Sequence, residues 1–207
     1  MVGSQMPGVY ATISEAIAAS EPSVIKISSN LYEEQLVIRK PGLVLEPKEK
    51  GGEVTIIQKE NACITVDVGK GNLCTINNLR MILLGPNKDD NPMSFQAEMD
   101  FENFGSEKCM LEFFTHKPDE MYTVILLKSG TLQLNGCIIS LDGIFKETYR
   151  KVPCVTVLHN SEIEMNHVWC KGDTTNGAST AGVIAFDADV EINNCTFAHF
   201  KSGGVMI

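Results

Sequence analysis

Apolar and polar residues alternate in short segments along the chain, and one of these segments recurs. Each copy reads apolar, polar, apolar, asparagine, a small or polar residue, and then three mostly apolar positions. The copies occupy residues 74–81, 132–139, 163–170 and 190–197. Their asparagines are separated by 58, 31 and 27 residues, so the first interval holds two periods or one period plus an insertion. A repeat in this range indicates a repetitive architecture such as a solenoid.

A short apolar run precedes each copy, at residues 64–66, 124–127, 155–158 and 183–186. One unit therefore contains roughly three short strands, separated by glycine, asparagine, aspartate and lysine. Alternation inside the copies is typical of strands with one buried face, and the connections are too short to hold helices. The pattern predicts an all-β solenoid in which each coil adds one strand to each of several parallel sheets.

The recurrent asparagines mark a turn of the repeat. Asparagine tolerates left-handed backbone angles, and its side chain can bond to backbone groups, so a sharp bend between two strands is expected here. Stacked coil upon coil, the amides are predicted to form a ladder with a structural rather than a chemical role. The ladder residues are Asn77, Asn135, Asn166 and Asn193. His167 takes the place that other copies give to asparagine or glycine, and is interpreted as a turn residue.

A short helix is predicted near the start of the chain, over residues 12–20. Thr12 or Ser14 can cap its N-terminus, and its isoleucines lie on one side. Because a solenoid exposes its hydrophobic stack at each end, residues 9–22 are predicted to cap the first coil.

Short strands and turns alternate after the cap. The predicted strands are 24–27, 36–38 and 43–45, and the predicted turn is 30–34. At the other end, residues 203–207 match the start of a further coil, and no polar residues cover it. We therefore expect either a fragment of a longer β-helix or self-association through this end.

Residues 85–120 interrupt the period with a segment that is both acidic and aromatic. Nine acidic side chains oppose three lysines here, which accounts for most of the net negative charge. Two interpretations are open: a hairpin that packs its aromatic side chains on the outside of the solenoid, or a surface that docks a partner protein. The candidate binding residues are Phe95, Asp100, Phe101, Phe104, Phe113 and Phe114. Two smaller insertions are expected at 142–151 and 171–182.

Charge and cysteine content bound the partners and the compartment. A net charge of −9 disfavours nucleic acid and anionic membranes, because both need a basic face. No segment is apolar for long enough to cross a bilayer. The seven cysteines are odd in number and lack CxxC spacing, so a reduced, cytoplasmic protein is predicted.

Candidate catalytic groups are few. Asp67, Asp187 and Asp189 each follow the first strand of a coil, and a polysaccharide lyase would need them to converge on one face to hold Ca²⁺. Their coils are separated, so neither a metal site nor a cofactor is predicted. Trp169 lies on an alternating strand, where it either packs against a loop or forms an exposed stacking platform for a sugar ring.

Three motifs near the start of the chain carry a resemblance to known proteins: Tyr10-x-Thr12-Ile13-x-Glu15-Ala16-Ile17, Val24-Ile25-x-Ile27 and Leu31-Tyr32-x-Glu34-x-Leu36-x-Ile38. They resemble the N-terminal cap of right-handed parallel β-helix proteins of the pectin-lyase-like class, and pectin methylesterases open in a very similar way. The later coils resemble repeats of bacterial carbohydrate enzymes. They are also similar to repeats of intracellular scaffolds such as the Shc SH2-domain-binding protein and the β-helical F-box proteins.

The resemblance to pectin methylesterases does not extend to their catalytic residues. Gln96-Ala97 and Asp100-Phe101 echo the esterase motifs, but they are four residues apart rather than on successive coils. We therefore predict one right-handed parallel β-helix domain of about six coils over residues 1–207, acting as a non-catalytic scaffold for another protein. The alternative is a carbohydrate-binding or polysaccharide-cleaving protein, with an extended polymer lying along one sheet.

Overall fold

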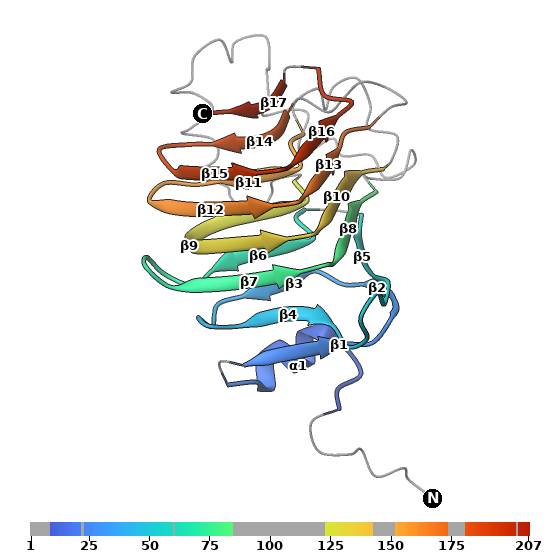
Figure 1. The fold of residues 1–207 in the computed structure, drawn as a ribbon. Coiled ribbons are helices and arrows are strands. Elements are labelled where there is room, and N and C mark those ends of the chain that lie inside the picture. Colours follow the sequence, from blue (N-terminus) through green and yellow to red (C-terminus); the bar gives the residue numbers. More distant parts are fainter. Residues whose placement is uncertain are drawn as a thin grey trace, which may run out of the picture.

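The strands form a right-handed parallel β-helix of six coils (Figure 1). The computed structural model describes residues 9–21, 23–59, 61–84, 123–142, 152–173, 181–201 and 203–207. The coils stack from α1 at one end to β17 at the other, and the strand pairings are parallel. The predicted fold class is confirmed.

Each coil supplies one strand to each of three sheets, which we name A, B and C. Sheet A contains β1 (Val24–Ile27), β4 (Val44–Pro47), β7 (Leu73–Asn77), the second half of β9 (Ile125–Asn135), β12 (Ser161–Asn166) and β15 (Asp189–Asn193). Sheet B contains β2 (Asn30–Glu33), β5 (Val54–Gln58), β8 (Arg80–Leu83), β10 (Ile138–Leu141), β13 (Trp169–Lys171) and β16 (Thr196–Ala198). Sheet C contains β3 (Leu36–Ile38), β6 (Ile64–Asp67), the first half of β9, β11 (Val155–Val157), β14 (Ala181–Ala185) and β17 (Gly203–Met206).

Stacks of similar residues fill the interior of the solenoid. On sheet C, Ile64, Ile125 and Val155 occupy matching positions on successive strands and are fully buried. Each buried aliphatic side chain contributes about 1.5–3 kcal/mol relative to an exposed one. Cysteines share this interior, and burial raises the pKa of the Cys63 and Cys74 thiols to about 12. These thiols therefore act as small, neutral core residues.

The helix α1 (Ile13–Ala19) closes the first coil. Thr12 caps it: Thr12 Oγ1 accepts a hydrogen bond from the Glu15 N–H at 3.1 Å, and the Glu15 carboxylate accepts one from the Thr12 N–H at 3.4 Å. Glu34 adds a second anchor, because its carboxylate accepts from the first two N–H groups of the helix, each at 2.9 Å. The buried side of α1 joins the main core, so the predicted helical cap is confirmed.

A row of side-chain amides runs along the corner between sheets A and B. Asn135 Nδ2 donates to Asn77 Oδ1 at 2.9 Å, and Asn166 Nδ2 donates to Asn135 Oδ1 at 3.0 Å. Asn193 Nδ2 continues the row by donating to Asn166 Oδ1 at 3.1 Å. Each rung therefore ties one coil to the next through a partly buried hydrogen bond.

The bend itself is made by the residue after each ladder asparagine. Ladder residues stay in their strands and pair across sheet A, as Asn77 does with Asn135. The left-handed residues, with φ of 53°, 62°, 55° and 53°, are Asn78, Gly136, His167 and Asn194. The sequence interpretation placed the bend one residue too early, because ending the strand at the asparagine keeps its amide pointed along the stack.

The predicted turn at 30–34 is wrong, because Asn30–Glu33 form β2, which pairs with β5. Leu31 points outward on this strand and is exposed, so no clear apolar alternation marks it. Residues 85–120, with all six candidate binding residues, lie outside the described ranges, as does most of each smaller insertion. Within the described ranges, no helix is long and apolar enough to span a membrane.

Candidate functional site

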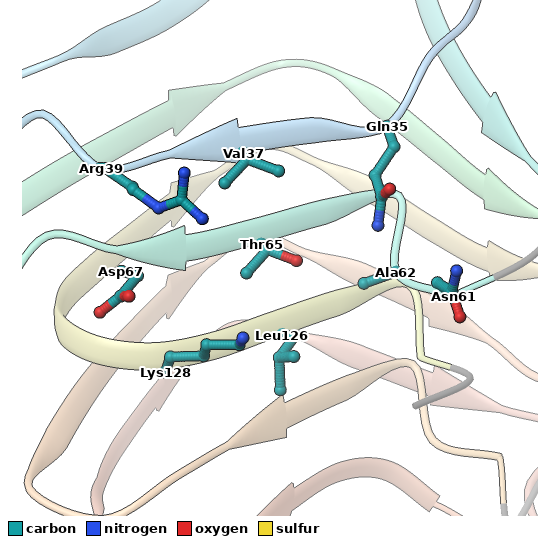
Figure 2. A pocket seen from close by; sticks show the side chains of 9 residues that line it. All are labelled: Gln35, Val37, Arg39, Asn61, Ala62, Thr65, Asp67, Leu126 and Lys128. Carbon is teal, nitrogen blue, oxygen red and sulfur yellow. The ribbon is translucent and has the colours of Figure 1, made fainter. Parts of the chain in front are cut away.

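The outer face of sheet C carries a pocket of about 300 Å³ near the N-terminal end of the solenoid (Figure 2). It crosses β3, β6 and β9, and it is lined by Gln35, Val37, Arg39, Asn61, Ala62, Thr65, Asp67, Leu126 and Lys128. Arg39 and Asp67 lie at one end, and Gln35 and Asn61 lie at the other.

Strand alternation explains why these side chains face outward. Val37, Thr65 and Leu126 pair in register on successive strands, while their sequence neighbours point into the core. Thr65 and Leu126 are nevertheless buried, and Leu126 belongs to a small apolar cluster separate from the main core. The floor therefore exposes apolar surface mainly at Val37, and the polar side chains lie at the strand ends.

Charges of opposite sign alternate beside this floor. Arg39, Asp67 and Lys128 come from successive coils, and each directly follows an inward-facing residue of its strand. Two cationic side chains thus face one carboxylate. In the described part of the chain, Arg39 makes no ion pair, and it is exposed to solvent. Among the described lining residues, two cations and one carboxylate therefore meet in a protein whose net charge is −9.

A β-bulge sets the position of Lys128. The register shifts between Val66 and Asp67, so Asp67 pairs with Ser129 rather than with Lys128. Ser129 Oγ donates to Asp67 Oδ1 at 2.5 Å and accepts from the Gly69 N–H at 2.9 Å. The bulge fixes the carboxylate at the rim and leaves Lys128 as an extra residue that lines the pocket.

The three aspartates proposed as a possible lyase cluster do not form a shared site. Asp67 lies at the pocket, whereas Asp187 Oδ2 lies 3.5 Å from His159 Nδ1 in another turn. Asp189 belongs to sheet A, where it pairs in register with Glu162. Among the residues that the structure describes, no group of three histidine, cysteine or acidic side chains can hold a metal ion.

Sequence reasoning missed most of the pocket. Of its polar residues, it had singled out only Asp67. Arg39 was detectable in principle, since it extends the alternation of β3 by one outward position. Lys128 was not detectable, because its position depends on the β-bulge between β6 and β9. These strands are far apart in the sequence, and the Gly69–Ser129 hydrogen bond beside the bulge joins residues 60 positions apart.

Comparison with known proteins finds solved structures that are similar to this chain. No protein-family model matches the chain, and no curated protein matches its sequence. A pectin methylesterase from Yersinia enterocolitica is similar in structure, with a TM-score of 0.55 and 13% identity over 91% of this chain and 55% of that one. A pectin methylesterase from Erwinia chrysanthemi has a TM-score of 0.53 and 18% identity over 94% of this chain and 53% of that one. The fold is that of the pectin methylesterases. This chain spans about half the length of these pectin methylesterases.

This finding contradicts the predicted role as a non-catalytic scaffold for another protein. Both of these similar structures are pectin methylesterases, and neither is a scaffold protein. Because one fold hosts many activities, the ligand itself must be argued from the residues of this chain. The scaffold prediction had relied on the faces of the solenoid and on residues 85–120, and the structure does not describe those residues.

Proposed function

We propose that this chain is a polysaccharide-processing protein that binds an acidic, pectin-like polymer across the outer face of sheet C. The observation that carries the proposal is the placement of Arg39 and Lys128 around Asp67, beside an apolar floor. A uronic acid unit presents a carboxylate next to a ring with apolar faces. The pocket offers a partner for each of these features.

The direction of the polymer follows from the stacking of the coils. The pocket crosses three strands that are about 4.8 Å apart, so it has room for more than one sugar ring along the solenoid axis. Arg39 can donate two parallel hydrogen bonds to a carboxylate, which a lysine cannot match. Gln35 and Asn61, at the opposite end, can bind sugar hydroxyl groups.

The test is a comparison of pocket variants in binding polygalacturonate of low methyl-ester content, measured by titration calorimetry. We expect Arg39→Ala and Lys128→Ala each to weaken binding about tenfold, because each removes a hydrogen bond to a charged group. Added salt should weaken binding by the parent protein more than by the variants. Lys50→Ala is the matched control, since Lys50 is an exposed cation outside the pocket.

Equal binding by the parent protein and both pocket variants would contradict the proposal. A second readout, release of methanol from methyl-esterified pectin, distinguishes binding alone from ester hydrolysis. If methanol is released, Asp67→Asn should abolish the release, because Asp67 is the single carboxylate among the described lining residues.

Other sequence predictions stay predictions. These are the cytoplasmic location, a single domain over residues 1–207, self-association through the C-terminal end, and the finer likeness to the Shc SH2-domain-binding protein and the F-box proteins. The lack of nucleic-acid and membrane partners is likewise a prediction.

A further inference from the structure

The outer face of sheet B presents an aromatic side chain between cations. Arg80, Ile138 and Trp169 pair in register on β8, β10 and β13, which lie side by side in Figure 1. Trp169 is 48% exposed and Ile138 is 37% exposed. Lys171 lies two residues after Trp169 on the same strand and therefore on the same face. We call Arg80, Ile138, Trp169 and Lys171 the Trp169 platform.

The backbone holds the indole outward. Val168 and Cys170, on either side of Trp169, are buried in the core, so the strand cannot turn its tryptophan inward without exposing them. The backbone N–H of Trp169 donates to the Cys137 carbonyl at 3.0 Å, which ties the strand to the coil before it. A solvent-facing indole beside an aliphatic side chain is a surface on which the apolar face of a sugar ring can stack.

The Arg80 guanidinium has unused hydrogen-bonding capacity. Arg80 carries five N–H donors, yet in the described part of the chain its ion pair is a single 3.5 Å contact from Nη1 to Glu53. The Arg80 side chain is 42% exposed, so its guanidinium remains accessible to a ligand. Arg80 lies two strands from Trp169, about 10 Å away across the sheet. One ligand that stacks on the indole can therefore also reach this guanidinium.

The outer face of sheet A has the opposite character. Glu162 pairs with Asp189 and Glu164 pairs with Glu191, so four carboxylates lie together on neighbouring strands. This acidic face repels an anionic polymer. Among its described residues, sheet B lacks such a cluster of paired carboxylates at Trp169, and its surface is separate from the sheet C pocket.

We propose that the Trp169 platform is a second carbohydrate-binding site, which takes an anionic oligosaccharide of uronic acid units. One sugar ring stacks on the Trp169 indole, and carboxylates of the same chain pair with Arg80 and Lys171. The ligand class rests on the proposed function, while the site itself lies on a different sheet. A protein with both sites holds a long acidic polymer on two of its faces.

The experiment uses the single tryptophan of the chain as its reporter. Titration of the full chain with a galacturonate hexasaccharide should shift and saturate the Trp169 fluorescence. The same shift should persist in the Arg39→Ala/Lys128→Ala variant, because the pocket lies on another sheet. Arg80→Gln should weaken the fluorescence-detected affinity about tenfold, and a neutral glucose hexasaccharide should bind much more weakly.

Calorimetry extends the test to variants without the reporter. Trp169→Ala should lose one class of binding sites, whereas Trp169→Phe should retain it, because the phenyl ring still stacks. Leu73→Ala is the control, since Leu73 is an exposed apolar residue on sheet A. Thermal unfolding of each variant checks that the fold is intact.

The possible outcomes separate the two sites. Binding heat that is lost in the pocket variant, with unchanged Trp169 fluorescence, overturns the second site and leaves the proposed function standing. A fluorescence shift that survives while the pocket variants bind like the parent protein supports the platform and overturns the role of the pocket. Absence of both heat and fluorescence change overturns both.

Discussion

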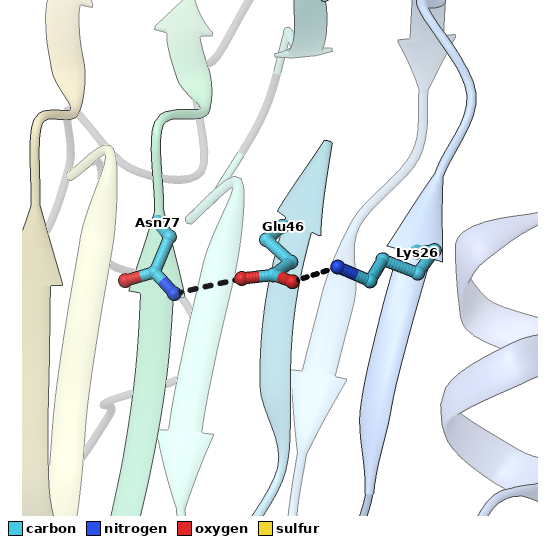
Figure 3. A network of polar contacts seen from close by, with 3 residues as sticks. All are labelled: Lys26, Glu46 and Asn77. Carbon is cyan, nitrogen blue, oxygen red and sulfur yellow. Dashed lines mark hydrogen bonds and ion pairs between the residues drawn. The ribbon is translucent and has the colours of Figure 1, made fainter. Parts of the chain in front are cut away.

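Glu46 holds the ladder position on the second coil, where later coils have asparagine. It pairs in register with Lys26, and it accepts hydrogen bonds from Lys26 Nζ and from Asn77 Nδ2, the latter at 3.2 Å (Figure 3). The row of amide donors thus ends on a carboxylate that accepts from both sides. The hydrogen bonds from Lys26 first, and then from Asn77, lower the pKa of the Glu46 carboxyl below its ordinary value.

The lowered pKa makes a pH-dependent contribution to stability. Because the folded-state pKa lies below the unfolded value, the contribution is complete above the ordinary pKa of 4.5 and is lost as the pH falls through the folded value. We expect Glu46→Gln to lower the free energy of unfolding at pH 7 by less than about 1 kcal/mol, since Lys26 is half exposed.

Urea unfolding of both proteins at several pH values measures this difference. It should shrink as the pH falls below 4.5. Glu33→Gln provides the control, because Glu33 pairs with Lys59 in a more exposed ion pair. A difference that is the same at pH 7 and at pH 3 would show that Glu46 acts through packing rather than through its charge.

The ladder is a property of the corner element rather than of one residue. Asn135 both donates to Asn77 and accepts from Asn166, so Asn135→Ala removes two partly buried hydrogen bonds, while Asn166 Nδ2 keeps its bond to Glu164. We expect this substitution to lower the free energy of unfolding by about 1–3 kcal/mol. Asn193→Ala, at the last rung, should cost less because Asn193 is bonded to only one other ladder amide. If chemical denaturation shows the same loss of unfolding free energy for both variants, each rung contributes equally wherever it lies in the ladder.

The strands were predictable from sequence wherever one face is buried. The alternation in β12 and the repeated apolar runs of sheet C correspond to residues that the interior encloses. Prediction failed at β2, whose side chains are mostly exposed and whose pairing with β5 supplies the stability instead. The alternation of apolar and polar residues in a strand reflects which of them are buried. A strand that is held mainly by hydrogen bonds to its neighbour therefore shows only weak alternation.

The pocket was less predictable than the fold for a related reason. Its polar residues come from three coils, and the gap of 58 residues between Asn77 and Asn135 hid which coils are adjacent. The single-residue shift at Asp67 then changes which side chain of β9 faces the pocket. Neither the adjacency nor the bulge has a local signal in the sequence.

At the scale of the whole molecule, charges cluster locally on different faces. Sheet A carries paired carboxylates on β12 and β15, while cations line the sheet C pocket and the Trp169 platform. Net charge disfavours nucleic acid and anionic membranes as partners, but a ligand at one face experiences mainly the charges within a Debye length, about 8–10 Å. A protein of net charge −9 can therefore bind an anionic polymer on selected faces.

Charge placement also predicts a stabilising substitution. Asp189 and Glu191 lie directly opposite Glu162 and Glu164, and like charges in register on neighbouring strands destabilise a sheet. Asp189→Asn/Glu191→Gln should therefore raise the free energy of unfolding, by about 0.2–1 kcal/mol for each pair at low salt.

Thermal unfolding at low and high salt separates local repulsion from net charge. The gain should fall as salt screens the paired carboxylates. The control, Glu21→Gln/Glu49→Gln, removes the same amount of negative charge from exposed positions outside the sheets. If both double variants are stabilised equally, the repulsion arises from the net charge of the whole molecule. If only the β15 variant gains, it is the register of sheet A that brings the carboxylates close enough to repel.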